Sequence, residues 1–269
     1  MKQKVADYIA DYIAKWGIRD VFTVTGGGAM HMNDAFGHHP KLHCTYQHHE
    51  QACAMAAEAY ARVDNRMAAV CVTTGPGATN AITGILGAWM DSIPMIVFSG
   101  QARYATTVPA SGLRLRSMGV QECNIVPVVT PLTKFAHMIV HPENIRYYLE
   151  KALYMAVNGR PGPVWLDIPL DVQGAVIETD ELNAYDPSEN PEEKPAEIPD
   201  SIIEQILNKI ETSERPVLTP GNGVRLAGAI KEFHRLVEIL GVPVVTGMSS
   251  VDALESENLY FVGRSGGTG

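Results

Sequence analysis

The feature that most restricts the fold of this sequence is a repeated order of apolar strand, glycine-rich turn and helix. Short apolar runs predict buried strands, and helical spacing of apolar residues separates them. The expected strands are 21–25, 42–46, 67–73, 94–99, 135–140 and 164–168; the expected helices are 5–13, 49–62, 78–90 and 142–156. Such alternation indicates an α/β fold, a parallel sheet with helices on both faces.

Three regions of this pattern are expected at one edge of the sheet. Gly26-Gly27-Gly28 follows the first strand, Glu50 lies where the second strand meets its helix, and Gly75-Pro76-Gly77 follows the third strand. Because right-handed crossovers bring the loops after parallel strands to one edge, where open α/β folds bind ligands, these regions define the candidate site.

A second domain is indicated after a linker. Prolines recur among glutamates between 186 and 199, which is typical of a linker. We therefore assign residues 1–175 to the first domain, 176–200 to the linker and 201–269 to a second α/β domain. That domain shows only helix 202–212, strand 217–219, turn 221–223, helix 227–240 and strand 242–246. Two parallel strands would leave apolar faces uncovered, so we expect it to be incomplete.

Composition excludes several classes of protein. The chain has 269 residues, of which 46% are hydrophobic, and a formal net charge of −9, so a basic stripe for nucleic acid is not expected. Charged residues interrupt the N-terminal apolar positions, and no run has the length of a membrane span. The four cysteines have no C-x-x-C spacing, which favours free thiols in a reducing compartment. We expect a cytoplasmic protein that binds neither membrane nor nucleic acid.

Six histidines lie between His31 and His49, but their spacing does not favour a metal site. Adjacent side chains such as those of His48 and His49 diverge in regular structure, and H-E-x-x-H is absent. We predict no metal ligands in this chain.

Each local pattern also has a structural interpretation. Glu50 suits a helix start because the helix dipole stabilises a carboxylate there. The turn at 75–77 could serve only to connect a strand and a helix, and it lacks the lysine of a phosphate loop. The segment 159–169 is expected to be structural. Gly221-Asn222-Gly223 could be half of a dinucleotide site, but the third glycine is missing.

The order of these motifs resembles the large-subunit acetolactate synthase family of thiamine-diphosphate enzymes. The matching elements span nearly all of residues 1–175; they are Gly26 to Gly28, His48 to Ala52, Thr73 to Asn80, Asp91 to Pro94, Gly119 to Glu122 and Gly159 to Pro169. Thr25 departs from the family, which often has proline there. Residues 215–225 look like the start of the family's central domain. The likeness is closest to members from surface-polysaccharide gene clusters. The resemblance to the family also implies a role in branched-chain amino acid biosynthesis.

The resemblance implies a role for each matching residue. Glu50 would be catalytic: it would bond the aminopyrimidine ring of thiamine diphosphate and stabilise its protonated form, so that the ring's amino group can activate the thiazolium carbon. That carbon attacks a 2-keto acid such as pyruvate, carbon dioxide leaves, and the acyl unit adds to a second carbonyl. The other implied cofactor-binding residues are Gly26, Gly27, Thr74, Gly75, Pro76, Gly77 and Asn80, and the implied substrate-pocket residues are Gly28, Ala29 and Gln121.

The diphosphate end of the family's site has no counterpart in this sequence. The family holds diphosphate through Mg²⁺ on a Gly-Asp-Gly motif, which does not occur here. We therefore expect Mg²⁺ to be supplied by a domain not in this chain: either a separate chain supplies that half, or the sequence is a fragment. The expected partner is a second copy in a homodimer or a separate diphosphate-binding chain. We expect this chain alone to be inactive, and we do not predict FAD binding, because only the start of the central domain is present.

Two other functions stay open at this stage. The chain could be an inactive relative that dimerises or docks on complete enzymes, or a nucleotide-binding oxidoreductase that uses the Gly221 turn.

Overall fold

The computed structural model describes residues 1–64, 66–191 and 196–266. Contacts between residues divide the chain into two compact units, Met1–Glu193 and Lys194–Gly269. Each unit is described by itself.

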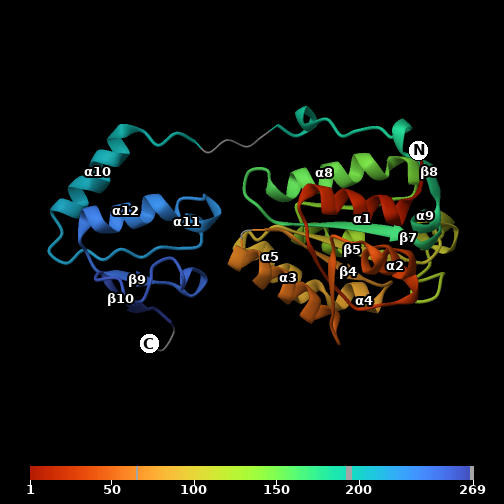
Figure 1. Cartoon of the computed structure of the whole chain (residues 1–269), viewed down its shortest axis with the longest axis horizontal. Coiled ribbons are helices and arrows are strands. Elements are labelled where there is room, and N and C mark those ends of the chain that lie inside the picture. The colour runs from red at the N-terminus through yellow and green to blue at the C-terminus, as the bar shows by residue number, and fades with distance from the viewer. Residues whose placement is uncertain (65, 192–195, 267–269) are drawn as a thin grey trace. The chain divides into compact units, whose positions relative to one another are not determined.

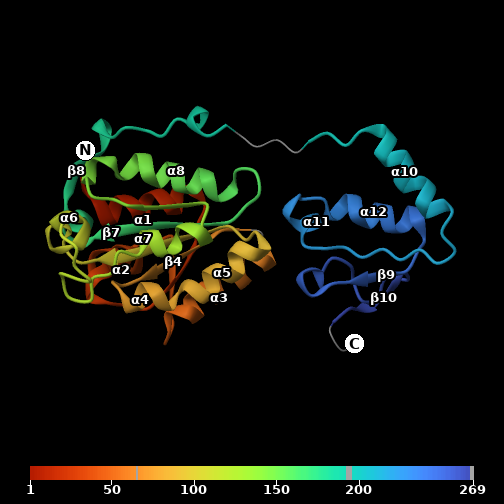
Figure 2. The same ribbon diagram turned by 180° about the vertical axis from the view of Figure 1, so that it is seen from behind.

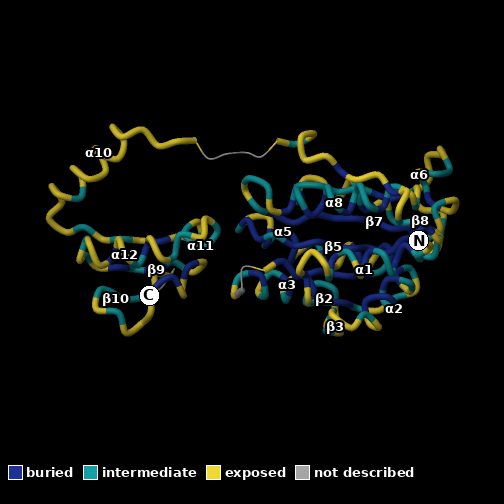
Figure 3. Tube along the Cα trace, turned by 45° about the horizontal axis from the view of Figure 1, so that its top comes forward, coloured by how far each residue is buried: buried dark blue, intermediate teal, exposed yellow. Residues whose placement is uncertain are grey.

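The first unit is built on a six-stranded parallel sheet, which confirms the predicted α/β fold (Figure 1). Its strands in sheet order are β3 (His43–Tyr46), β2 (Asp20–Thr23), β4 (Ala68–Val72), β5 (Met95–Gln101), β7 (Pro163–Pro169) and β6 (Phe135–Met138). Every neighbouring pair is parallel. The middle strands β5 and β7 are buried along their whole length, as a parallel sheet covered on both faces requires (Figure 3).

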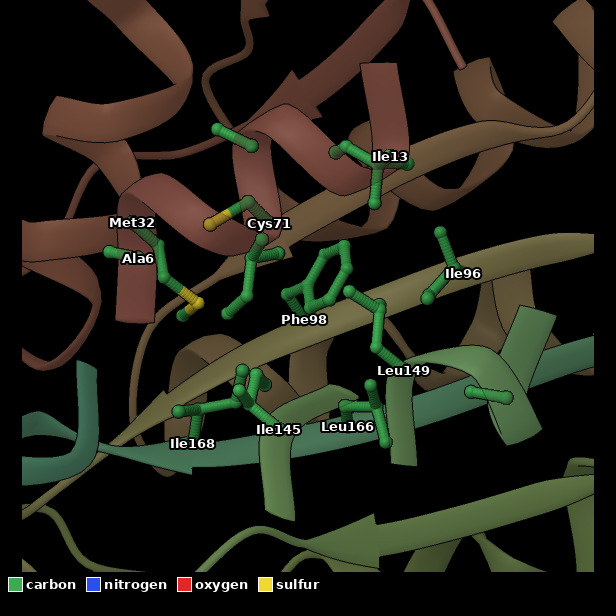
Figure 4. Packing of buried hydrophobic residues seen from close by; sticks show 14 of the residues in the cluster. Ala6, Ile13, Met32, Cys71, Ile96, Phe98, Ile145, Leu149, Leu166 and Ile168 are labelled. Carbon is green, nitrogen blue, oxygen red and sulfur yellow. The ribbon is translucent and has the colours of Figure 1, made fainter. Parts of the chain in front are cut away.

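Helices cover both faces of this sheet (Figures 1 and 2). The helices on one face are α1 (Val5–Trp16), α2 (Met30–His38), α8 (Ile145–Val157) and α9 (Leu170–Gly174); those on the other are α3 (Glu50–Asp64), α5 (Ile82–Asp91) and α7 (Val126–Val129). Alternate residues of a strand serve the two cores: Cys71 joins the first cluster, whereas Val70 and Val72 join the second. Figure 4 shows Phe98 and Leu166 of the sheet packed with Leu149 of α8 in the first cluster.

Helix α1 shows how local sequence sets an element. Val5, Ile9 and Ile13 recur every four residues and are all fully buried against the sheet. Gly17 ends the helix in the left-handed region at φ 112°, which glycine adopts without steric cost.

The order of the strands makes the chain change direction between β2 and β4. From β2 the chain first moves to one side to form β3 and then crosses to the other side to form β4. The loops that leave β2 and β4 therefore run in opposite directions from neighbouring strands, and open sheets bind ligands at such a point.

Some elements of the first unit were not predicted. Strand β1 (Lys2–Lys4) pairs antiparallel with β8 (Val176–Glu178), and a short α4 (Pro76–Asn80) precedes α5. The segment after residue 101 contains η2 (Tyr104–Thr106) and α6 (Val108–Ser111). The remaining single turns are η1 (Gly27–Ala29), η3 (Thr130–Leu132), η4 (Pro142–Asn144), η5 (Thr179–Glu181) and η6 (Pro187–Glu189).

Residues 176–191 pack on the first unit. The backbone N–H of Tyr185 donates to Glu150 Oε2 at 2.8 Å, and the Tyr185 ring lies 5.6 Å from those of Tyr147 and Tyr154 on α8. Leu182 is buried in the first core. Residues 192–195 of the expected linker lie outside the described residues.

The second unit has a smaller core. Its elements are α10 (Asp200–Glu211), α11 (Gly223–Leu226), α12 (Ile230–Leu240), β9 (Val244–Thr246), η7 (Met248–Ser250) and β10 (Phe261–Arg264). Strands β9 and β10 are parallel. The strand expected at 217–219 is wrong, because this segment makes only a single bridge from Leu218 to Val244. Phe233 and Val237 of α12 fill the core, whereas α10 buries no residue.

In the described part of the chain, no helix combines the length and the hydropathy that crossing a bilayer requires.

Candidate functional site

The loops after β2 and β4 interlock at the carboxyl edge of the sheet. The backbone N–H of Gly28 donates to Thr73 Oγ1 at 3.1 Å. A Cβ built on Gly28 would lie 1.8 Å from Thr74 Oγ1, and one built on Gly26 would lie 2.4 Å from the Cβ of Thr73. Both contacts are far shorter than atoms allow, so only glycines let these loops approach so closely.

Gly75 brings a third segment to the same place. Its φ of 56° lies in the left-handed region, and a Cβ on it would lie 1.9 Å from the carbonyl oxygen of Gln121. Gln121 is itself in the left-handed region at φ 58°, an unusual conformation for a residue with a side chain. The long loop after β5 therefore rests directly on the Gly75 turn.

Glu50 lies beside this turn, as the first residue of α3. Its Oε2 accepts a hydrogen bond from Asn80 Nδ2 at 2.9 Å, and its Oε1 lies 3.2 Å from a Cβ built on Gly77. Within residues 1–64, 66–191 and 196–266, Oε1 accepts no hydrogen bond. The helix N-terminus stabilises a carboxylate at this position. A half-buried carboxylate thus has one oxygen held and the other facing a position without a side chain.

A thiol lies one turn along the same helix. Burial, with a further contribution from the Glu50 charge, raises the pKa of Cys53 to about 12. Cys53 therefore stays a neutral thiol and does not compete with Glu50 as a charged group.

The other predicted site residues differ in exposure. Thr74 and Ala29 are buried, whereas Gly27 and Pro76 are exposed, and nothing lies within 4 Å of a Cβ built on Gly27. Gly27 therefore marks the open side of the site, and Thr74 and Ala29 support it from below.

Two side chains that hold the first loop were not predicted from the sequence. Gln173 Nε2 donates to the carbonyl oxygens of Gly28 and Ile168, each at 2.7 Å, and Asn33 Oδ1 accepts from the N–H of Gly26 at 3.3 Å. Gln173 lies 145 residues from Gly28 in the sequence, and a single glutamine in a helical pattern does not predict such a distant contact.

Asp167 forms a buried polar group within the segment expected to be structural. Its Oδ1 accepts from Ser99 Oγ at 2.6 Å, and its Oδ2 accepts from Gln101 Nε2 at 3.1 Å. Burial raises the pKa of Asp167 to about 7, against the opposing effect of these two hydrogen bonds. The Glu122 charge raises it further.

The histidines are spread over the surface of the described chain. His38, His39 and His43 contact Asp34, Asp11 and Asp20 respectively. Among the described residues, no group of three or more histidine, cysteine, aspartate or glutamate side chains is arranged to hold a metal ion.

A separate cleft of about 290 Å³ lies at the opposite, amino edge of the sheet. It is lined by Trp89, Met90, Lys134, Arg160 and Pro161, none of which is a predicted site residue. Its lining residues include the cations of Lys134 and Arg160 and no carboxylate, whereas the carboxyl edge has the Glu50 carboxylate.

Comparison with known proteins agrees with this geometry. Residues 3–123 match the family model described as thiamine pyrophosphate enzyme, N-terminal TPP binding domain, and residues 203–269 match that of the family's central domain.

The similar curated proteins are named acetolactate synthases. The large subunit from Lactococcus lactis is 32% identical over 252 residues, covering 93% of this chain and 42% of the relative. The isozyme 3 large subunit from Escherichia coli is 31% identical over 268 residues, covering 97% and 44%. The chloroplastic acetolactate synthase 2 from Zea mays is 32% identical over 260 residues, covering 95% and 39%. The chain thus spans less than half the length of these relatives. It belongs to the thiamine pyrophosphate enzyme family and carries sequence of that family's N-terminal and central domains.

Proposed function

We propose that this chain is the cofactor-activating part of a thiamine-diphosphate-dependent enzyme that decarboxylates 2-keto acids such as pyruvate and joins the acyl unit to a second carbonyl, as the name acetolactate synthase implies. The observation that carries the proposal is the Glu50 carboxylate, held by Asn80 beside the side-chain-free Gly77. The resemblance of the relatives supports the same chemistry.

The residues present fit the aminopyrimidine half of the cofactor. A protonated ring nitrogen needs a carboxylate oxygen to accept its hydrogen bond, and Glu50 Oε1, which accepts none among the described residues, offers it beside Gly77. Gly26, Gly27, Thr74, Gly75 and Pro76 complete the backbone surface around this point.

The cofactor and this chain would each contribute a different part of the chemistry. Thiamine diphosphate, when bound, supplies a carbon nucleophile and an electron sink for decarboxylation. Glu50 would hold a proton at the ring nitrogen through Oε1, while Asn80 keeps Oε2 in place. Glu50 is the first residue of α3, and a helix N-terminus interacts favourably with a negatively charged side chain.

The substrate would lie on the side of the loops away from the sheet. We assign Gly28, Ala29 and Gln121 to the pocket that receives the 2-keto acid. Gln121 approaches the Gly75 turn through its backbone and is exposed, so its amide can reach a bound carboxylate or carbonyl.

The diphosphate and Mg²⁺ would be held by residues outside these 269. The sequence contains no Gly-Asp-Gly, and we propose that a separate chain or another segment supplies this half of the site. A role in branched-chain amino acid or surface-polysaccharide synthesis and a location in the cytoplasm stay predictions from the resemblance. FAD and the acyl acceptor are not assigned.

The decisive experiment replaces Glu50 by glutamine. The chain is combined with thiamine diphosphate, Mg²⁺ and a diphosphate-binding half from an acetolactate synthase, and pyruvate consumption is measured. We expect Glu50→Gln to lower turnover at least about 100-fold with an unchanged circular dichroism spectrum, because the proton at the ring nitrogen loses its carboxylate. Glu58→Gln, a matched change two turns along α3 that removes part of an ion pair with Arg62, should stay within a few-fold of wild type.

Equal turnover in Glu50→Gln and wild type would show that the proposed mechanism is wrong. If the wild-type chain binds no thiamine diphosphate by calorimetry, with Mg²⁺ and the supplied half both present, a docking module becomes the better description.

A further inference from the structure

We infer that Gln101 is a positioning residue, held in place by Asp167, which pins the two ends of the 102–122 loop together and so sets where Gln121 lies in the site. The inference rests on the proposed function only in giving Gln121 a pocket to line. We call the hydrogen bonds from the Gln101 side chain to Ala102, Cys123 and Asp167 the clamp, and all of them lie within this chain.

The two ends of the loop meet at the Gln101 side chain. Its Oε1 accepts from the N–H of Ala102 at 3.0 Å, and its Nε2 donates to the carbonyl oxygen of Cys123 at 2.7 Å. One buried amide therefore bonds the first residue of the loop and the residue just after it.

Asp167 fixes the orientation of that amide. Gln101 Nε2 gives its other hydrogen to Asp167 Oδ2 at 3.1 Å, and Ser99 Oγ, which itself accepts from Trp165 Nε1 at 2.8 Å, donates to Oδ1. These residues lie on the fully buried neighbouring strands β5 and β7. The clamp is therefore anchored in the fully buried middle of the sheet, where a polar group depends on its hydrogen-bond partners.

Inside the loop, a second carboxylate and a glycine hold its shape. Glu122, which is 5% exposed, accepts from the backbone N–H of Val108 at 3.2 Å through Oε1 and of Met118 at 3.1 Å through Oε2. A Cβ on Gly119 would lie 2.8 Å from the carbonyl oxygen of Thr106, so the loop closes on itself. Glu122 and Gly119 fix the internal shape of the loop, and Gln101 fixes where that shape sits on the sheet.

The consequence for the site is the contact between Gln121 and Gly75. Gln121 has a positive φ and lies two residues before the pinned Cys123 carbonyl, with its own carbonyl oxygen against the Gly75 turn. A residue in this sparsely populated region keeps its conformation only when its surroundings determine it. Without the clamp, the end of the loop would no longer hold Gln121 in this conformation.

The clamp can be tested without cofactor, because the loop carries exposed trypsin sites at Arg114 and Arg116. The full chain is treated with trypsin under conditions in which every variant is folded, and the rate of cleavage at these two arginines is followed by mass spectrometry. Hydrogen exchange of β5, β7 and α3 reports the sheet in parallel. Gln101→Leu removes the clamp with little change of volume. We expect about tenfold faster cleavage. The cleavage rate follows the fraction of molecules in which the loop is open, and losing one or two hydrogen bonds raises that fraction by about this factor.

Variants of Asp167 separate positioning from packing. Asp167→Leu should also speed cleavage, whereas Asp167→Asn, which can still accept from Gln101 through Oδ1, should remain close to wild type. The double variant Gln101→Leu/Asp167→Leu should open the loop no more than Gln101→Leu alone, because both changes remove the same restraint. Gln3→Leu is the matched control, since Gln3 bonds only Asp11 at a remote position.

Equal cleavage rates for Gln101→Leu and wild type would overturn the inference, as would faster cleavage accompanied by equally faster exchange throughout β5 and β7. Neither readout uses thiamine diphosphate. A failure of the proposed function would therefore appear as absent cofactor binding in the wild-type chain, with the effect of Gln101→Leu on the loop intact.

Discussion

The two edges of the central sheet differ in a way that shows what makes a site. The amino edge has an open cleft of about 290 Å³, lined by Trp89, Met90 and the cations of Lys134 and Arg160. The carboxyl edge instead has three loops so closely packed that glycine is required at their contacts, with the Glu50 carboxylate beside them. The volume of a cleft therefore does not select the candidate site in this chain. The candidate site is selected by the backbone turns that meet beside the Glu50 carboxylate. The predictions below test this difference.

The largest effect expected is on the pH dependence of stability, through Asp167 at the carboxyl edge. Its pKa in the folded chain is raised from 3.8 to about 7, chiefly by burial. The folded state therefore holds this proton more tightly than the unfolded state, and its contribution to stability is present below about pH 4 and is lost as the pH rises toward 7. The difference corresponds to roughly 4 kcal/mol at most.

Denaturant unfolding at several pH values measures this dependence. Asp167→Asn, which cannot ionise, should flatten the curve between pH 4 and 7, and a curve that keeps its full slope in this variant would assign the dependence to other groups.

The second prediction compares glycines at the two edges. Gly75→Ala should lower the free energy of unfolding by about 2–4 kcal/mol, because it combines a left-handed φ with a clash against a backbone carbonyl that cannot move freely. Gly162→Ala at the amino edge meets the flexible Lys134 side chain at 3.1 Å and Trp89 at an ordinary contact distance of 3.7 Å, and should cost less than about 1 kcal/mol. Urea denaturation of both variants checks this; equal losses would mean that the two edges are packed alike.

The third prediction concerns the amide that holds the acid. Asn80→Ala removes the hydrogen bond to Glu50 Oε2 and should weaken thiamine diphosphate binding about tenfold in the complex with the supplied half. Asn158→Ala at the amino edge removes an amide that donates to the Asn190 carbonyl, and it should leave the affinity unchanged. Isothermal calorimetry distinguishes the two, and similar losses in both would show that the effect of Asn80 is not local.

The smallest effect is expected for the amino-edge cleft itself. Arg160→Gln alters its charge and its hydrogen bond to Ser92 Oγ. Cofactor affinity should stay within about twofold of wild type, since exposed charges beyond a Debye length are screened. A large loss of cofactor affinity in this variant would show that the cleft takes part in cofactor binding.

How far the sequence could predict this molecule depends on the range of the interactions. Local patterns were enough for the alternating strands and helices, and strand order then follows from few choices, so the α/β fold was predicted. The placement of Glu50 and the Gly75 turn at one edge followed from the same rule, because they follow the carboxyl ends of β3 and β4, two parallel strands that flank β2. The assignment of these residues to a cofactor came from the resemblance and stays a prediction.

The missed features depend on distant partners. Strand β1 pairs with β8, more than 170 residues away, and neither run is long enough to announce a strand. The bonds from Gln101 to Asp167 and from Gln173 to Gly28 connect residues whose local patterns are ordinary. The strand expected at 217–219 failed for the opposite reason: its apolar run is local, but it finds only one bridge to β9.

Thr73 gives one residue control over the spacing of two loop segments. Its side chain lies where a Cβ of Gly26 or Gly77 would be, and its hydroxyl accepts from the N–H of Gly28. The distance between these backbone segments is therefore set by the volume of a single threonine. A larger side chain at this position would push the two segments apart, and a smaller one would leave a void between them.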